Sequence, residues 1–351
     1  MYYINPHIKS LYRTSSTDSR YGFIRLDMNE NPEGLPKHFF ESVLEEITPE
    51  YVAMYPETGS LIKKLGYHLK FESDNICLTN GSDDAIRLLF EAFGEPGKKV
   101  ISVNPSFEMY RVYMGMYGMV HSPIEFNENF EVEASTILST INSDTGIVVL
   151  LNPNSPIGAS WSEDEIKRII EKANANNAMV IIDEAYYYFS SVTFLNLVNE
   201  YKNVVVLRTF SKMLSVAGCR LGYIVANNKL IDIIKRACSS YPVNCFAIKF
   251  AEKLLDNNEV INELIEVEKK GREYLLDQLQ KSKYFYHFNE GNYVLIKPNK
   301  CPQSLFKGLK QKNILIKTYQ MPILSKWIRV TTGSRELMEK FWVIFKELDR
   351  A

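Results

Sequence analysis

Lys212 is the residue whose type and setting suit covalent chemistry. It follows an apolar run, Val204 to Leu207, that is typical of a β-strand, and it stands among small and hydroxyl side chains. Partial burial lowers the proton affinity of a lysine amine, and the neutral amine attacks carbonyl carbons to form a Schiff base. A single lysine is more often a solvated surface group. The rest of the chain must therefore decide between these two interpretations.

Four further residues follow apolar runs in the same way as Lys212. They are Asp83, Phe107, Asn152 and Asp183. The apolar runs alternate with helical patterns, which predicts an α/β fold with a mostly parallel sheet flanked by helices. Since ligands of such sheets bind beyond the carboxyl ends of the strands, we expect all five residues to converge on one site.

The pattern changes after about residue 229, which predicts a second domain. A long charged helix is expected at Val260–Gln280, and short strands at Tyr293–Lys297, Ile314–Lys317 and Trp327–Thr331. This alternation is typical of a small α+β domain. We therefore expect an N-terminal arm over 1–25, a large cofactor-binding domain over 26–235, and a small C-terminal domain over 236–351 that packs with the arm.

The composition excludes several classes of function. The 351 residues carry 41 basic and 42 acidic side chains, so no overall field attracts nucleic acid or an anionic membrane. No apolar run is long enough for a membrane-spanning helix, and the polar N-terminus lacks a signal core. The five cysteines and five histidines are too scattered for a metal site. We expect a cytoplasmic protein with small-molecule partners, no metal, no nucleic acid and no membrane.

A Schiff base between Lys212 and pyridoxal 5'-phosphate would place further demands on the chain, and the sequence offers a candidate for each. The ring nitrogen needs a carboxylate to keep it protonated, and Asp183 can supply one. The phenolic oxygen needs hydrogen-bond donors, which Asn152 and Tyr186 provide. The ring face packs on an aromatic side chain, and Phe107 qualifies.

The cofactor phosphate needs backbone N–H groups, a hydroxyl group and a cation. The turn Gly81-Ser82-Asp83 lies between a strand-like run and a helical pattern, a unit that points N–H groups at an anion. Ser211 and Arg220, on either side of Lys212, add the hydroxyl and the cation. Taken singly, Arg220 could form a surface ion pair and Asp183 could cap a turn, but the joint pattern favours a cofactor site.

Several segments resemble the class I and II aminotransferases, which are pyridoxal-phosphate enzymes. Three carry the family pattern: NPNSPIG at Asn152–Gly158, DEAY at Asp183–Tyr186 and SKMLSVAGCRLG at Ser211–Gly222. Five others are most similar to the histidinol-phosphate aminotransferase branch: LDMNENPEG at Leu26–Gly34, MYPETG at Met54–Gly59, NGSDDAI at Asn80–Ile86, PSFEMY at Pro105–Tyr110 and WIRVTTGS at Trp327–Ser334.

This resemblance implies a fold-type I transferase that acts as a homodimer with active sites at the subunit interface. It implies that Tyr55 reaches across the interface to the cofactor phosphate in the partner subunit. It further implies that Arg329 holds the carboxylate or phosphate of the substrate, because an arginine fork suits both anions. Asn31 and Lys317 are expected on the same substrate side of the site.

The resemblance also implies a ping-pong reaction. Lys212 acts as general base and acid at the substrate α-carbon, and Asp183 and Tyr186 are its catalytic neighbours. The default substrates are histidinol phosphate and 2-oxoglutarate, which give imidazole-acetol phosphate and glutamate.

Other functions remain open from the sequence. One is transamination of another small phosphorylated ketone or amine, and another is decarboxylation of an amino-acid phosphate of the threonine-phosphate type, since Lys212 serves all of these. A non-catalytic cofactor-binding regulator is disfavoured, because we find no basic DNA-binding segment before Leu26. A nicotinamide dehydrogenase is disfavoured because no G-x-G-x-x-G follows a strand-like run.

Overall fold

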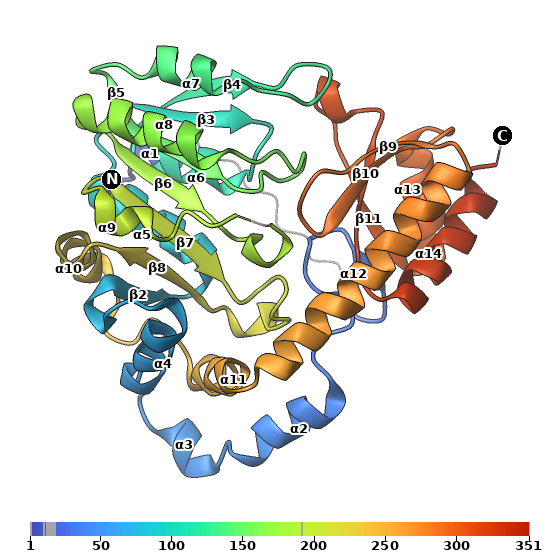
Figure 1. Ribbon diagram of the computed structural model, residues 1–351, viewed down its shortest axis with the longest axis horizontal. Coiled ribbons are helices and arrows are strands. Elements are labelled where there is room, and N and C mark those ends of the chain that lie inside the picture. The colour runs from blue at the N-terminus through green and yellow to red at the C-terminus, as the bar shows by residue number, and fades with distance from the viewer. Residues whose placement is uncertain (1, 10, 12–18, 191, 351) are drawn as a thin grey trace.

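Two β-sheets of unequal size organise the chain (Figure 1). The computed structural model describes residues 2–9, 11, 19–190 and 192–350. The seven-stranded sheet contains, in spatial order, β2 (Ile76–Thr79), β8 (Gly222–Ala226), β7 (Val204–Thr209), β6 (Met179–Asp183), β5 (Thr145–Leu151), β3 (Lys99–Asn104) and β4 (Val120–Glu125). The five-stranded sheet contains β1 (Ile24–Leu26), β11 (Ile314–Thr318), β12 (Ile328–Thr331), β10 (Tyr293–Lys297) and β9 (Phe285–His287).

The strands of the large sheet run parallel except for β8, which lies antiparallel between β2 and β7. Its inner strands are almost continuous apolar runs, as in β7, because both faces of the sheet are covered. The predicted α/β fold with a mostly parallel sheet flanked by helices is therefore confirmed, together with a smaller α+β unit.

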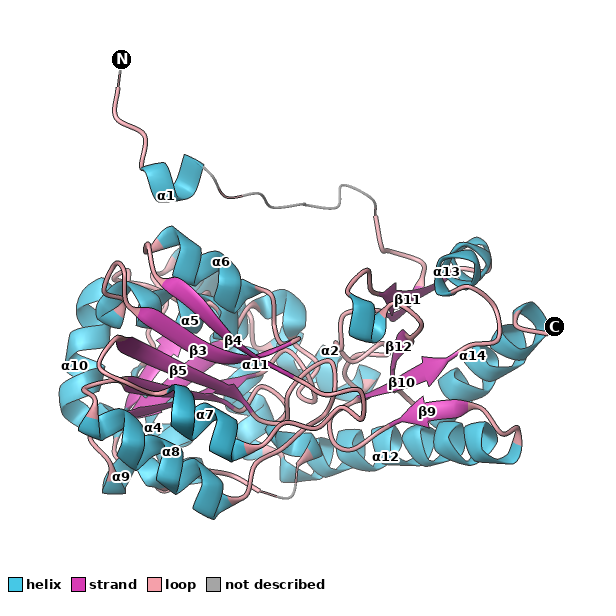
Figure 2. Cartoon of the chain, turned by 90° about the horizontal axis from the view of Figure 1, so that it is seen from above, coloured by secondary structure: helices cyan, strands magenta, loops and turns pink. Residues whose placement is uncertain are grey.

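Each face of the large sheet packs on its own layer of helices (Figure 2). Side chains alternate along a strand, so Val148 and Leu150 of β5 enter one core while Ile147 and Val149 enter the other. The first core includes α4 (Gly59–Leu69), α7 (Ala134–Thr140), α8 (Glu163–Ala175), α9 (Leu197–Glu200) and α11 (Cys245–Asp256). The second core includes α5 (Gly81–Phe93), α6 (Met109–Met116) and α10 (Asn228–Ala237).

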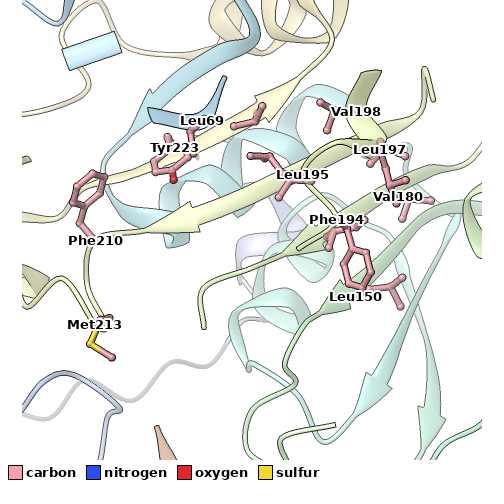
Figure 3. Packing of buried hydrophobic residues seen from close by; sticks show 14 of the residues in the cluster. Leu69, Leu150, Val180, Phe194, Leu195, Leu197, Val198, Phe210, Met213 and Tyr223 are labelled. Carbon is pink, nitrogen blue, oxygen red and sulfur yellow. The ribbon is translucent and has the colours of Figure 1, made fainter. Parts of the chain in front are cut away.

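The chain on both sides of Lys212 is anchored in the first of these cores (Figure 3). Phe210 and Met213 are buried, and Phe210 packs edge-on against Tyr223 of β8, with their ring centroids 6.0 Å apart. The backbone N–H of Val216 donates to the carbonyl of Phe210 at 3.3 Å and closes the loop. Lys212 itself is half-buried, so a well-packed loop presents a partly accessible amine.

The small sheet packs on α12 (Asn258–Lys281), α13 (Pro302–Gln311) and α14 (Arg335–Leu348). Helix α12 passes from one unit to the other, as Figure 1 shows: Leu264 lies in the first core of the large sheet and Leu275 in the core of the small one. The predicted division at 235/236 falls inside α10, and the one at 25/26 falls inside β1. Strand β1 pairs in parallel with β11, so the N-terminal segment contributes to the small sheet.

Three helices precede α4, namely α1 (Pro6–Lys9), α2 (Lys37–Glu45) and α3 (Pro49–Ala53). Helix α8 begins at a capping box, in which Ser162 and Glu165 each bind the backbone N–H of the other. Among the described helices, none is long and apolar enough to span a membrane.

A buried ion pair joins the carboxyl ends of β6 and β7 on the face of the first core. The Glu184 carboxylate accepts from Nε and Nη2 of Arg208 at 2.9 and 2.8 Å, and these side chains are 1% and 7% exposed. The same carboxylate accepts from the backbone N–H of Phe194 at 2.6 Å. The pair therefore fixes the relative position of the two strands that carry Asp183 and Lys212.

We expect Glu184→Gln to lower the free energy of unfolding by about 3–5 kcal/mol, because Arg208 would keep a buried charge without its carboxylate. Chemical denaturation of the purified variant measures this change. The matched control is Glu336→Gln, which breaks an exposed ion pair with Lys340 on α14 and should leave the denaturation midpoint unchanged. Equal effects of the two substitutions would contradict a structural role for the buried pair.

Candidate active site

The carboxyl edge of the large sheet gathers the residues that the sequence predicts for cofactor binding. Asn152 follows β5, Asp183 ends β6 and Lys212 comes shortly after β7, and these three strands are neighbours in the sheet. The Gly81–Asp83 turn starts α5 directly after β2, on the far side of β8. Parallel pairing of β5, β6 and β7 brings the first three segments to one edge, and the Gly81–Asp83 turn lies at the same edge because β2 and β7 both run antiparallel to β8, which lies between them.

The Lys212 amine lies between the N-terminal segment and the DEAY segment. Its Nζ donates to the backbone carbonyl of Met28 at 2.9 Å and lies 5.7 Å from the ring centroid of Tyr186. The backbone N–H of Ser211 donates to Oγ1 of Thr209 at 3.1 Å, which fixes the turn between the strand and the lysine. The amine thus has a defined position and no carboxylate among these contacts.

The Asp183 carboxyl is almost completely buried and accepts hydrogen bonds from neutral donors. Its Oδ2 accepts from the Tyr110 hydroxyl at 2.7 Å, and its Oδ1 accepts from the backbone N–H of Ala185 at 3.0 Å. Burial raises the pKa of Asp183 to about 6, although both hydrogen bonds and the charge of Lys212 act to lower it. The ionised carboxylate would therefore gain from a cationic partner in the site.

Asn152 and Tyr186 differ in whether their polar side-chain atoms have hydrogen-bond partners. Oδ1 of Asn152 accepts from the backbone N–H of Trp161 at 3.0 Å, while its buried Nδ2 has no acceptor among the described residues. The Tyr186 hydroxyl accepts from Nδ2 of Asn29 at 2.8 Å. Burial acts to raise the pKa of Tyr186, but the charge of Lys212 and other nearby groups outweigh it and leave the pKa below its usual value.

An anion cradle lies at the N-terminus of α5. The backbone N–H groups of Gly81, Ser82 and Asp83 belong to the first turn of this helix, where no intrahelical acceptor is available. The Arg220 guanidinium passes so close that a Cβ on Gly81 would lie 2.6 Å from its Nη2. Nη1 of Arg220 donates to Oγ of Ser211 at 3.5 Å, so the predicted hydroxyl and cation do meet at this turn.

Phe107 and Tyr55 are the predicted aromatic contacts of the cofactor. Phe107 is 41% exposed and meets Tyr110, the partner of Asp183, edge-on with their ring centroids 5.7 Å apart. Tyr55 is 74% exposed and stacks on Tyr241 at 4.4 Å, so its aromatic contact is not a member of the Lys212 cluster.

The three predicted substrate residues occupy different surroundings. Arg329 of β12 is 8% exposed, and its Nη1 and Nη2 donate to Oγ of Ser155 at 3.3 Å and to the carbonyl of Asp27 at 2.6 Å. Lys317 of β11 pairs with Arg329 across the sheet but is exposed. Nδ2 of Asn31 donates to Oγ of Ser215, three residues after Lys212, at 2.7 Å.

Three residues of the site were not predicted from the sequence: Asn29, Tyr110 and Ser155. Asn29 is buried and left-handed, with a φ of 57°, and it donates to both the Tyr186 hydroxyl and Oγ of Ser155. Tyr110 lies at the start of α6, three residues after Phe107, and its place in the PSFEMY segment was the available signal. Ser155 lies inside the NPNSPIG segment.

These features fit the groups of pyridoxal phosphate. The unsatisfied Nδ2 of Asn152 suits the phenolic oxygen, and the buried carboxyl of Asp183 suits a protonated ring nitrogen. The α5 cradle with Arg220 suits a phosphate dianion. Lys212 provides the amine that an aldehyde requires.

Comparisons with known proteins agree with this arrangement. The family model described as aminotransferase class I and II matches residues 23–343. The histidinol-phosphate aminotransferase of Thermoanaerobacter pseudethanolicus is 31% identical over 342 residues, which cover 96% of this chain and 95% of that protein. Histidinol-phosphate aminotransferase 1 of Carboxydothermus hydrogenoformans is 32% identical over 324 residues, which cover 90% of this chain and 91% of that protein.

One solved structure has the same fold at lower identity. It is the histidinol-phosphate aminotransferase of Sinorhizobium meliloti in complex with pyridoxal-5'-phosphate, which superposes with a TM-score of 0.88 at 18% identity and covers 99% of this chain and 97% of that one. The match of the family model to nearly the whole chain, together with relatives above 30% identity, shows that this chain belongs to the class I and II aminotransferases.

Proposed function

We propose that this chain is a pyridoxal-phosphate-dependent aminotransferase that transfers the amino group of histidinol phosphate to 2-oxoglutarate, giving imidazole-acetol phosphate and glutamate. The observation that carries the proposal is the meeting of Lys212, Asp183 and Asn152 at three neighbouring strand ends. The names of the relatives of about 31% identity support the substrate pair. Location in the cytoplasm stays a prediction.

Bound pyridoxal phosphate supplies an aldehyde that takes up the amino group and a ring that stabilises negative charge at the substrate α-carbon. Asn152 and Tyr186 would orient the ring through its phenolic oxygen, and the α5 cradle with Arg220 would hold the phosphate. Lys212 removes the proton from the substrate α-carbon and returns a proton in the second half of the reaction. Its hydrogen bond to Met28 keeps the amine on one side of the site.

Asp183 and Tyr110 would set the electrostatics at the ring nitrogen of the cofactor. A buried carboxylate without a cation is costly, and a protonated ring nitrogen would remove that cost. The carboxylate would in turn keep the ring nitrogen charged, which favours withdrawal of electrons from the substrate. The Tyr110 hydroxyl fixes the carboxylate so that one oxygen stays oriented toward the neighbouring helix.

Arg329 is the group that would bind the anionic end of each substrate. It is buried, it is always charged, and its described partners are neutral oxygens rather than carboxylates. The same cation can serve the phosphate of histidinol phosphate in one half-reaction and a carboxylate of 2-oxoglutarate in the other. A ping-pong enzyme needs this double use because both substrates occupy one site in turn.

We further propose that the protein acts as a homodimer in which Tyr55 completes the partner's site. Large apolar side chains are exposed along α2, α3 and the segment after them: Phe40, Leu44, Val52, Met54 and Tyr55. These elements lie at the periphery of the molecule, below α11 in Figure 1. Several large exposed apolar side chains on neighbouring segments are typical of a protein–protein contact.

The function is tested by mixing the cofactor-loaded protein with histidinol phosphate and following the visible absorption of the cofactor. We expect the spectrum to change and to recover when 2-oxoglutarate is added, with glutamate released. Lys212→Ala should slow this exchange by roughly 10²–10⁴-fold or more, because the proton transfer loses its base. Lys340→Ala on the exposed face of α14 is the control. Release of carbon dioxide, or no response to histidinol phosphate alongside a response to another phosphorylated amine, would refute the proposed reaction.

Asp183 predicts a pH dependence for the cofactor-free protein. Its pKa is about 6 in the fold against 3.8 in the unfolded chain, so the stabilisation from proton uptake is complete below pH 3.8 and is lost as the pH rises through 6. Two pKa units correspond to about 3 kcal/mol. We expect wild type, relative to Asp183→Asn, to lose about that much free energy of unfolding between pH 4 and pH 7. Tyr110→Phe should move the loss to higher pH, and parallel profiles for wild type and Asp183→Asn would rule out this titration.

The shared site is tested with hybrid dimers made from Lys212→Ala and Tyr55→Ala subunits. If Tyr55 serves the partner's site, each hybrid contains one intact site and one site with both substitutions. Remixed subunits should then be more active than the average of the two parent proteins. Activity equal to that average would show that Tyr55 acts within its own subunit or not at all, and a monomer by light scattering would exclude the dimer.

A further inference from the structure

One edge of the Arg329 guanidinium has no acceptor. Its two terminal nitrogens donate to Oγ of Ser155 and to the carbonyl of Asp27. Its Nε is buried and lacks a hydrogen-bond partner within the described part of the chain. A buried N–H group without an acceptor costs free energy of folding, and native proteins leave few of them.

The Tyr319 hydroxyl is a second buried group in the same condition. Tyr319 directly follows β11, two residues after Lys317, and its ring packs against the first core of the large sheet. In the described residues, its hydroxyl has no partner at standard hydrogen-bond geometry. Burial raises the pKa of Tyr319, while the charge of Arg329 and a side-chain contact with Arg329 lower it, so the hydroxyl lies directly beside the guanidinium.

The neighbouring tyrosines have partners, which sets Tyr319 apart. The Tyr293 hydroxyl donates to the carbonyl of Asn154 at 2.8 Å, and the Tyr186 hydroxyl accepts from Asn29 at 2.8 Å. The Tyr293 ring also lies under the guanidinium, 5.6 Å from it. Two adjacent donors, Nε of Arg329 and the hydroxyl of Tyr319, are therefore buried without a hydrogen-bond acceptor among the described residues.

We propose that Tyr319 is a substrate-contacting specificity residue, whose hydroxyl and the Nε of Arg329 together bind one oxyanion group of the amino or keto substrate. The cation selects a negatively charged group, and the hydroxyl adds a directed donor beside it. Each terminal nitrogen gives one of its two hydrogens to a protein oxygen, and Nε gives none, so we place the substrate on the Nε side of the fork, beside Tyr319. This inference rests on the proposed transaminase function and adds Tyr319 as a second residue that contacts the anionic end of the substrate.

The test compares Tyr319→Phe with wild type, because this change removes only the hydroxyl. Calorimetric titration of the cofactor-loaded protein with inorganic phosphate and with succinate measures binding of the two oxyanion types without turnover. We expect binding to weaken about tenfold or more, as for a lost hydrogen bond to a charged group. In half-reactions with glutamate, the dissociation constant should rise while the limiting rate changes little.

A second measurement separates substrate binding from a structural role. If the hydroxyl is unsatisfied in the free protein, Tyr319→Phe should raise the melting temperature in the absence of anions. A structural hydroxyl would give the opposite sign. Tyr284→Phe is the matched control: its hydroxyl accepts from Asn299 at 3.4 Å and its ring packs on Trp342 and Phe345 in the core of the small unit.

The outcomes discriminate between sources of the oxyanion. Weaker binding of phosphate alone supports a phosphate contact, and weaker binding of both anions supports one subsite used in both half-reactions. Unchanged binding of both, or a lower melting temperature, overturns the proposal and leaves a water molecule as the partner of the two donors. A wild-type protein that ignores histidinol phosphate but reacts with glutamate would refute the proposed substrate and leave the test of Tyr319 intact.

Discussion

The burial of the Asp183 carboxyl is the constraint on which the rest of the site depends. Two successive residues, Asp183 and Glu184, leave β6 on opposite faces of the sheet, and each carries a buried carboxyl. Glu184 has a cation, Arg208, in direct contact, so the two buried charges neutralise each other. Among the described residues, a hydroxyl and an N–H are the direct hydrogen-bond partners of Asp183, and Lys212 acts on it without a hydrogen bond, so the ionised carboxylate would gain from a cationic ligand in contact. The two neighbouring carboxyls thus differ: Glu184 is paired within the fold, and Asp183 is the one that we propose for cofactor binding.

Arg329 is the cationic counterpart of Asp183: a buried charged group without an oppositely charged partner in direct contact. It is buried, and its direct partners are a hydroxyl and a carbonyl, so it retains most of its attraction for an anion. A buried acid and a buried cation would neutralise each other if they touched. Here they belong to different sheets, and a chain of hydrogen bonds runs from Arg329 through Ser155 and Asn29 to Tyr186, three residues after Asp183. The site therefore holds a buried acid and a buried cation at fixed positions, each without an oppositely charged group in direct contact, which is the preorganisation that electrostatic catalysis requires.

The sequence predicts what depends on local pattern and misses what depends on distant contacts. Strand β10 matches its predicted range, and β11 and β12 each differ from theirs by one residue, because apolar runs bounded by turns have few alternatives. The cofactor residues follow such runs in the large sheet, so their convergence follows from parallel pairing. Strand β9 and helix α7 were not predicted, because β9 is only three residues long and largely exposed, and α7 is short and rich in serine and threonine. Asn29 bonds to Thr331, 302 residues away, and no local signal encodes that contact.

Asn29 shows how the two units share one site. Its backbone N–H donates to Oγ1 of Thr331, its carbonyl accepts from Asn292, and its side chain donates to Tyr186. A left-handed φ is tolerated by asparagine better than by most residues, which permits this turn in a buried position. Arg329 lies two residues before Thr331 on β12, and Met28, which accepts from the Lys212 amine, directly precedes Asn29. Helix α12 and the hydrogen bond from Tyr293 to Asn154 also join the two units, so Asn29 is one of several links through which the small sheet is positioned relative to Lys212.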